Sequence, residues 1–148
     1  MIDRQYIGHV LPSHSALVEV GRLQFFAKSI GQTDPVYTEL AAAKAAGHPS
    51  LPVPPTFLFC LEMASPDPSY MRNLLGIDLK RLLHGEEGFT YHRMAYAGDT
   101  LTFEPRIDDI YDKKNGALDF VIRITRVTNQ HGEHVADLRA VIVQRNAL

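Results

Sequence analysis

Apolar residues in the first half of the chain recur with the period of an α-helix. In residues 22–30 they lie three and four positions apart, which predicts an amphipathic helix that ends at Gly31. Residues 39–46 are rich in alanine and predict a second helix with Thr38 as its cap. Residues 56–64 are apolar on nearly every side, so a helix there has to be buried over most of its surface.

In the second half of the chain, apolar and polar residues alternate with the two-residue period of a β-strand, which predicts an antiparallel sheet. The Lys-Lys-Asn-Gly sequence of residues 113–116 predicts a hairpin turn, because asparagine and glycine tolerate the positive φ angles of such turns. Residues 65–83, between the two halves, predict a polar loop with one short helix. Strands are expected at residues 15–20, where Gly21 ends the strand, and at residues 88–94, 100–111, 118–127 and 134–144.

The order of these elements, helices first and strands afterwards, indicates the α+β class. The economical packing curls an antiparallel sheet around the apolar helix of residues 56–64, so we expect a hot-dog fold that forms one domain over residues 1–148. One strand, residues 118–127, shows the alternation clearly. Its two faces carry an apolar set, Leu118, Phe120, Ile122 and Ile124, and a polar set, Asp119, Arg123 and Thr125.

The composition of the chain argues against nucleic-acid-binding, disulfide-bonded and membrane-spanning proteins. With 15 basic and 17 acidic residues the net charge is −2, and no basic stripe suits a nucleic acid. A single cysteine, Cys60, excludes an internal disulfide and suits a reducing compartment. No apolar run approaches the ~20 residues of a membrane span, and the first residues lack an apolar signal core. We therefore expect a cytoplasmic globular protein that binds neither nucleic acid nor membrane.

One segment carries a specific order of residues. The helix of residues 22–30 is followed by Gly31, Pro35 and Val36, and then by the alanine-rich helix. This order resembles the signature of MaoC-like R-specific enoyl-thioester hydratases, which reads Gly-Asp-x-Asn-Pro-apolar-His. Residues 82–101 resemble the N-terminal-type MaoC dehydratase domain, which is related to the dehydratase part of fatty acid synthases. The resemblance implies a hot-dog protein of fatty acid metabolism that binds an acyl thioester of coenzyme A or of acyl carrier protein.

The residues that carry catalysis in that family are replaced here. The resemblance assigns the family's aspartate to Gln32, its histidine to Tyr37 and its asparagine to Asp34. Glutamine cannot act as a general base, and tyrosine titrates near ~10 unless it is strongly perturbed. Asp34 is therefore either a displaced catalytic carboxylate or the cap of the segment that holds Tyr37. His84 is a substitute acid or base, or alternatively a structural histidine.

The family also presents a glycine N–H to the thioester carbonyl before the central helix. Here Pro54 and Pro55 occupy that region, and prolines have no N–H. Thr56 or Phe57 could donate instead, and losing such a donor typically lowers a rate by ~10²–10³. Substrate contacts are expected from Tyr37, which alternatively packs against the sheet, and from Pro55, Thr56, Phe57, His84 and Gly85.

Other reactive side chains have simpler interpretations. His131 and His134 have a loose metal spacing, but they lie on a hairpin turn without a third ligand, so we expect neither a metal nor a cofactor. Cys60 lies in an apolar helix and is expected to be a small buried residue. Adjacent carboxylates such as Glu86 and Glu87 point to opposite faces of a strand and form no acid–base couple. Three basic side chains are either phosphate ligands for coenzyme A or ordinary solvated charges: Lys80, Arg81 and Arg93.

Three functions remain open. The first is a subunit of an R-specific 2-enoyl-thioester hydratase, equivalently a 3-hydroxyacyl-thioester dehydratase, whose Asp/His dyad comes from a MaoC-like partner. The second is a homodimeric acyl-thioester-binding protein without chemistry. The third is a hot-dog thioesterase. A lone hot-dog sheet leaves a long edge strand unpaired, so we expect a homodimer or a heterodimer.

Overall fold

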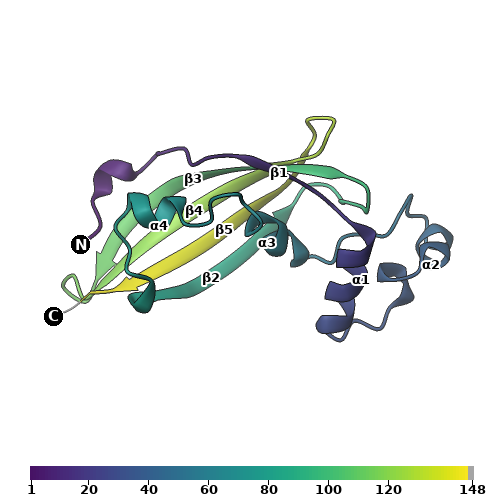
Figure 1. Cartoon of the computed structure of the whole chain (residues 1–148), viewed down its shortest axis with the longest axis horizontal. Helices are drawn as coiled ribbons and strands as arrows, with labels where there is room; N and C mark the ends of the chain where they lie inside the picture. The colour runs from purple at the N-terminus through teal and green to yellow at the C-terminus, as the bar shows by residue number, and fades with distance from the viewer. Residues whose placement is uncertain (147–148) are drawn as a thin grey trace.

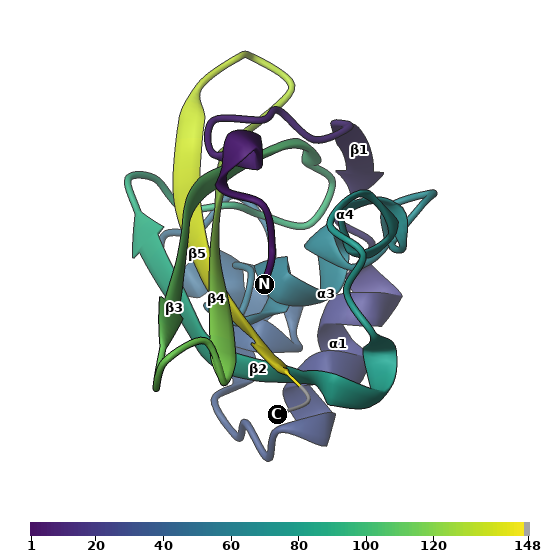
Figure 2. The same ribbon diagram turned by 90° about the vertical axis from the view of Figure 1, so that its left-hand side faces the viewer.

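The computed structural model describes residues 1–146, and its centre is one antiparallel sheet (Figure 1). The strand order is β1-β3-β4-β5-β2, so β1 and β2 are the two edges and the sheet is not closed. Figure 2 shows that the sheet curls towards α3, α1 and α4. The strands are β1 (His14–Leu17), β2 (Leu82–Tyr91), β3 (Thr100–Lys113), β4 (Leu118–Thr128) and β5 (His134–Arg145).

The helices are short and occupy two regions. In Figure 1, α3 and α4 lie over the middle of the sheet, whereas α1 and α2 lie beyond one end of it. None of the helices among the described residues is long and apolar enough to cross a membrane. They are η1 (Arg4–Tyr6), α1 (Val20–Ser29), η2 (Pro35–Tyr37), α2 (Leu40–Ala45), α3 (Phe57–Glu62), α4 (Tyr70–Leu74) and η3 (Leu79–Arg81).

The expected hot-dog architecture is confirmed, but the central helix is shorter than predicted. Helix α3 buries Phe57, Leu58 and Leu61 in one core cluster together with residues of α1 and the sheet. A second cluster, which includes Leu75 and Ile77, covers the rest of the inner face beside α4 and the N-terminal segment. The inner face is therefore covered by two short helices in succession, with a gap between them.

Three element boundaries differ from the predicted ones. Gly21 does not end a strand but lies in the first turn of α1, because Glu19 is extended and the helix begins directly after it. Thr38 does not cap α2; it is instead the C-cap of η2, where its N–H donates to the Pro35 carbonyl oxygen at 3.0 Å. Strand β2 begins at Leu82 rather than at residue 88, because a β-bulge between His84 and Glu86 interrupts the alternation that would have revealed it.

Strand β4 divides its residues between the faces as predicted, and its polar set faces the helices. Asp119 and Thr125 are buried there, and the Asp119 carboxylate accepts from the Ile2 N–H at 2.8 Å. The predicted turn after β3 is also present, with positive φ at Lys114 and Asn115. The apolar set of β4 packs on the outer face in a cluster with Tyr111, Val141 and Val143.

Candidate functional site

The family's dyad positions lie on the segment around η2. The Gln32 side-chain oxygen accepts from the Asp34 N–H at 3.0 Å, so this amide is turned towards its own loop. Asp34 caps η2, since its carboxylate accepts from the Val36 N–H at 3.0 Å. This geometry supports the capping interpretation of Asp34 rather than a catalytic one. Tyr37 ends η2 and is half-buried.

The loop before α3 offers one free backbone donor. The Phe57 N–H already donates to the Pro54 carbonyl oxygen at 2.9 Å, which removes one of the two expected substitutes for the family's glycine. The Thr56 N–H has no protein acceptor among residues 1–146. The loop itself is held to the sheet, because the Tyr91 hydroxyl donates to the Pro55 carbonyl oxygen at 2.7 Å. Thr56 is therefore the remaining candidate to bind a thioester carbonyl.

A cavity of about 420 Å³ lies between α3 and the edge strand β2. Three of the predicted contacts, Thr56, His84 and Gly85, come together in its wall. The His84 ring meets the Phe59 ring edge-on, with 6.3 Å between the ring centroids. The full lining is Thr56, Phe59, His84, Gly85, Glu86, Glu87 and Phe89.

The other predicted contacts lie outside this cavity. Phe57 faces a second cavity, of about 390 Å³, between α1 and α3, which Cys60 also lines. Pro55 and Tyr37 line neither of these two cavities. The structure therefore groups Thr56, at the start of the central helix, with the residues that begin β2, and separates them from the η2 segment.

Gly85 lies at the β-bulge of β2 and permits close contact with β5. A Cβ atom there would be 3.0 Å from Val143 Cγ2 and 3.2 Å from the Val141 carbonyl oxygen. Both distances are shorter than an ordinary van der Waals contact between a carbon atom and a non-bonded heavy atom. A larger residue would push β2 away from β5, so this glycine maintains the shape of the cavity wall.

Glu87 also lines this cavity, and the sequence analysis assigned it no chemical role. It is paired with Ala140, which is paired in turn with Arg123, so the three share the inner face of the sheet. Burial and then repulsion by the Glu62 carboxylate raise the pKa of Glu87 to about 7, although Arg123 acts in the opposite direction. Glu86 lies at the cavity rim on the opposite face of β2, as predicted, and its carboxylate accepts from Arg139 at 2.7 Å. Glu87 can therefore exchange a proton near neutral pH.

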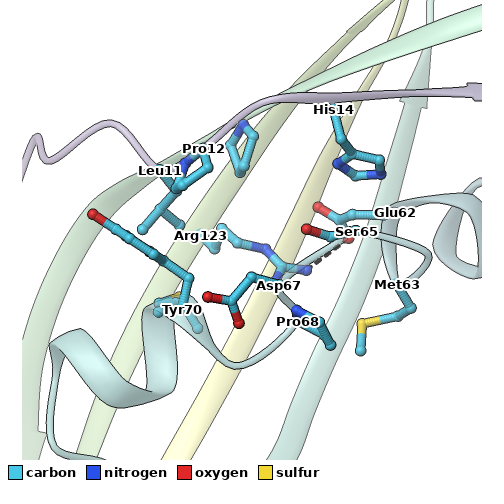
Figure 3. A pocket seen from close by; sticks show the side chains of 12 residues that line it. Leu11, Pro12, His14, Glu62, Met63, Ser65, Asp67, Pro68, Tyr70 and Arg123 are labelled. Carbon is cyan, nitrogen blue, oxygen red and sulfur yellow. Dashed lines mark hydrogen bonds and ion pairs between the residues drawn. The ribbon is translucent and has the colours of Figure 1, made fainter.

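Beneath the last turn of α3 lies a buried polar group that the sequence analysis also missed. Glu62 accepts from Arg123 at 2.6 Å and from the Thr125 hydroxyl. Glu62 and Arg123 border a small pocket of about 70 Å³ in the gap between α3 and α4 (Figure 3). His14 lines the same pocket, and its Nε2–H donates to the Leu61 carbonyl oxygen at 3.0 Å.

Two buried nitrogen atoms of this pocket lack a hydrogen-bond partner among residues 1–146. They are His14 Nδ1 and Arg123 Nε. Because His14 Nε2 carries the proton that Leu61 accepts, Nδ1 of a neutral ring is an acceptor, whereas Arg123 Nε–H is a donor. The pocket therefore suits a group that both donates and accepts, such as a hydroxyl group or water.

The basic residues considered for coenzyme A are mostly paired with carboxylates. Arg93 lies 3.2 Å from Glu133, and Arg81 lies 3.5 Å from Asp78. These exposed pairs favour the interpretation as ordinary surface charges. The His131 ring lies 3.3 Å from the Gln130 amide nitrogen and is not part of the cluster that His134 forms with His92 and Asp137.

Comparisons with known proteins agree with this architecture. A family model described as the FAS1-like dehydratase domain region matches residues 5–138. A UPF0336 protein of Saccharopolyspora erythraea is 36% identical over 97% of this chain and 92% of its own length. A UPF0336 protein of Streptomyces coelicolor is 35% identical over 99% of this chain and 97% of its own length.

Solved structures show the same fold at lower identity. The C-terminally truncated HadBC (3R-hydroxyacyl-ACP dehydratase) complex of Mycobacterium tuberculosis superposes with a TM-score of 0.77 at 22% identity, over 93% of this chain and 96% of that one. A MaoC-like dehydratase superposes with a TM-score of 0.85 at 24% identity, over 96% of this chain and 43% of that one. The ChsH1–ChsH2 complex of M. tuberculosis reaches 0.74 at 19% identity, over 93% and 89% of the two chains. The chain thus belongs to the FAS1-like dehydratase-region family and has the hot-dog fold of MaoC-like dehydratases.

Proposed function

We propose that this chain is the subunit without a dyad in an R-specific 2-enoyl-thioester hydratase, equivalently a 3-hydroxyacyl-thioester dehydratase. The observation that carries the proposal is the identity of the dyad positions. Gln32 has no basic group and turns its amide into its own loop, and Tyr37 carries a phenol where the family has an imidazole. Water addition therefore requires an aspartate and a histidine from another chain.

The similar structures support a second subunit. HadBC and ChsH1–ChsH2 are each named as complexes of two components. This chain spans only 43% of the MaoC-like dehydratase that it matches, so a second part is present within that longer protein. We infer that a separate partner subunit with the same fold takes the place of the remaining part of that longer chain.

The free edge strand β2 is the surface where we place this partner. Strand β2 is paired with β5 on one side only, and an unpaired strand edge tends to pair with another chain. The cavity that contains Thr56 and His84 borders this strand. A partner at β2 would enclose that cavity and complete a channel for the acyl chain, with the Thr56 N–H directed at the thioester carbonyl.

Two other functions stay in competition. A homodimer of this chain would bind acyl thioesters without chemistry. A thioesterase would need a carboxylate or a histidine beside the thioester carbon, and His84 and Glu87 line one cavity. The thioesterase is the weaker candidate, because the motif order of the chain follows that of hydratases.

An assay with crotonyl-coenzyme A separates the three functions. The samples are the purified protein, lysate of the source cell, lysate depleted of this protein, and depleted lysate after the protein is added back. We expect no hydration by the protein alone, loss of activity on depletion and recovery on addition. Unchanged activity after depletion favours the binding protein, release of free coenzyme A by the protein alone favours the thioesterase, and robust hydration by the protein alone refutes the proposal.

A further inference from the structure

Three side chains with metal-binding atoms converge where β2 leaves the sheet. His92 follows β2, and His134 and Asp137 lie on β5. The two oxygen atoms of the Asp137 carboxylate meet different rings, His92 Nε2 at 2.8 Å and His134 Nε2 at 2.9 Å. The three ligand atoms all lie within 4.8 Å of one another. The two imidazole rings are 4.2 Å apart at their centroids.

The backbone holds these side chains in place. The N–H groups of His92 and Arg93 both donate to the Val135 carbonyl oxygen, at 2.8 and 3.2 Å, which fixes the end of β2 against β5. The hairpin before β5 is fixed by Asn129, whose side-chain oxygen accepts from the N–H groups of His131 and Glu133 at 3.0 Å each. A site whose ligands are already oriented loses little entropy when it binds an ion.

We propose that His92, His134 and Asp137 form a binding site for a divalent transition-metal ion of the zinc class, with the remaining coordination position open to water. Two imidazole nitrogens and one carboxylate oxygen are a common ligand set for such ions. Bonds of about 2.0–2.1 Å in tetrahedral geometry place neighbouring ligand atoms about 3.3 Å apart. The observed separations of 2.8 and 2.9 Å need only a small outward movement of each ring.

The ion would replace the protons that now lie between the rings and the carboxylate. In the free protein each Nε2 donates to Asp137, whereas a metal-bound Nε2 has to be deprotonated. Each neutral ring keeps its single proton, which moves from Nε2 to Nδ1 so that Nε2 can coordinate the ion. The site is separate from the acyl cavity, so it depends on no part of the proposed function.

Nearby charges set the affinity. Arg126 is the cross-strand partner of Asp137 on β4, so it shares the face with the three ligands and repels a cation. Arg93 is compensated by Glu133 at 3.2 Å. Removing the Arg126 charge should strengthen zinc binding, and this direction is the opposite of what damage to the fold would produce.

The test is calorimetric titration of the full chain with zinc chloride after treatment with a chelator. We expect one ion per chain and a melting temperature that rises with zinc concentration, because the ion binds the folded state. His92→Ala and Asp137→Asn should each weaken binding at least about tenfold, and Arg126→Gln should strengthen it. His131→Ala is the matched control, an exposed histidine of the same hairpin outside the cluster, and should leave binding unchanged.

Either of two results overturns the inference. One is the absence of zinc binding by the folded wild-type chain. The other is binding that persists in Asp137→Asn or that disappears in His131→Ala, which would place the ion elsewhere. Circular dichroism of each variant establishes that it is folded, and Asp137→Asn retains a side chain that can accept a hydrogen bond from either ring.

Discussion

Glu62 on α3 and Arg123 on β4 form an ion pair across the inner face of the sheet, with 2.6 Å between the carboxylate oxygen and the guanidinium nitrogen. Only 4% and 15% of their side chains remain exposed. A buried pair of this kind gains little over an apolar pair of similar volume, but a single charge left without its partner is costly. The pair therefore joins the end of the central helix to the middle of the sheet.

Removing one member of this pair should destabilise the protein strongly. We expect Glu62→Gln to lower the free energy of unfolding by about 3–5 kcal/mol, because Arg123 stays buried without a counter-charge. The control is Glu86→Gln, which removes an exposed pair with Arg139 and should cost about 1 kcal/mol or less. Urea unfolding measures both, and equal losses would show that burial of the first pair has no energetic consequence.

The central helix should depend on its apolar side chains. Phe57 and Leu61 are 2% and 0% exposed, so Phe57→Ala or Leu61→Ala should each lower the free energy of unfolding by about 2–5 kcal/mol. Leu79, at 64% exposure, serves as the matched control, and Leu79→Ala should change stability little. A melting temperature that is insensitive to both core substitutions would contradict the role assigned to α3.

The stability of the protein should depend on pH through Glu87. Its pKa rises from 4.5 in the unfolded chain to about 7 in the folded one, so the folded state holds the proton more tightly. This contribution is complete below pH ~4.5 and is lost as the pH rises through ~7. Glu87→Gln should remove that decline from a series of urea unfolding curves between pH 4 and 8. Glu86→Gln should retain it, and identical curves for wild type and Glu87→Gln would refute the assignment.

Restoring the dyad should create hydratase activity. The substitutions Gln32→Asp and Tyr37→His place a carboxylate and an imidazole on the same loop, where Gly31 and Pro35 still follow the family pattern. General acid–base catalysis contributes ~10²–10⁴-fold, so the double variant should hydrate crotonyl-coenzyme A measurably above wild type. Each single variant should stay near background. Activity of the wild type equal to that of the double variant would mean that the chain already contains its own acid and base.

The chain should not be a monomer in solution. Strand β2 has an unpaired edge along its length, and such edges are usually covered by pairing. Light scattering of the purified protein at micromolar concentration should give at least twice the chain mass of 16.6 kDa. A mass of one chain under these conditions, with the fold intact by circular dichroism, would contradict the proposed partner surface.

Much of the architecture follows from the pattern of apolar residues, and the site follows only in part. The strands from β3 to β5 have long regular alternation, so their ranges are close to the predicted ones. Alternation fails at the bulge beside Gly85, which is why the first half of β2 was not recognised. Thr56 and His84 were expected near the substrate and do share a cavity.

Glu87 and the Glu62–Arg123 pair could not be foreseen, because their chemistry depends on contacts between distant segments. Glu62 is the single charged residue of residues 56–64, and its partners come from a strand far along the chain. The neighbour that links Glu87 to Arg123 is Ala140, and this relation exists only through the strand register. Local periodicity contains no information about such pairings.

Because the inner face of β4 carries polar side chains, the contacts of Asp119 and Arg123 help to fix the register of β4 in the sheet. A slip of one residue would exchange the faces of a strand, and in β4 the exchange would bring apolar side chains inward, so hydrophobicity alone opposes it weakly. Only the observed alignment lets Asp119 meet the N-terminal backbone and lets Arg123 meet Glu62. The two alignments of β4 bury a similar amount of apolar surface. The charged contacts add little net stability, but they form only in the observed alignment and therefore favour it during folding.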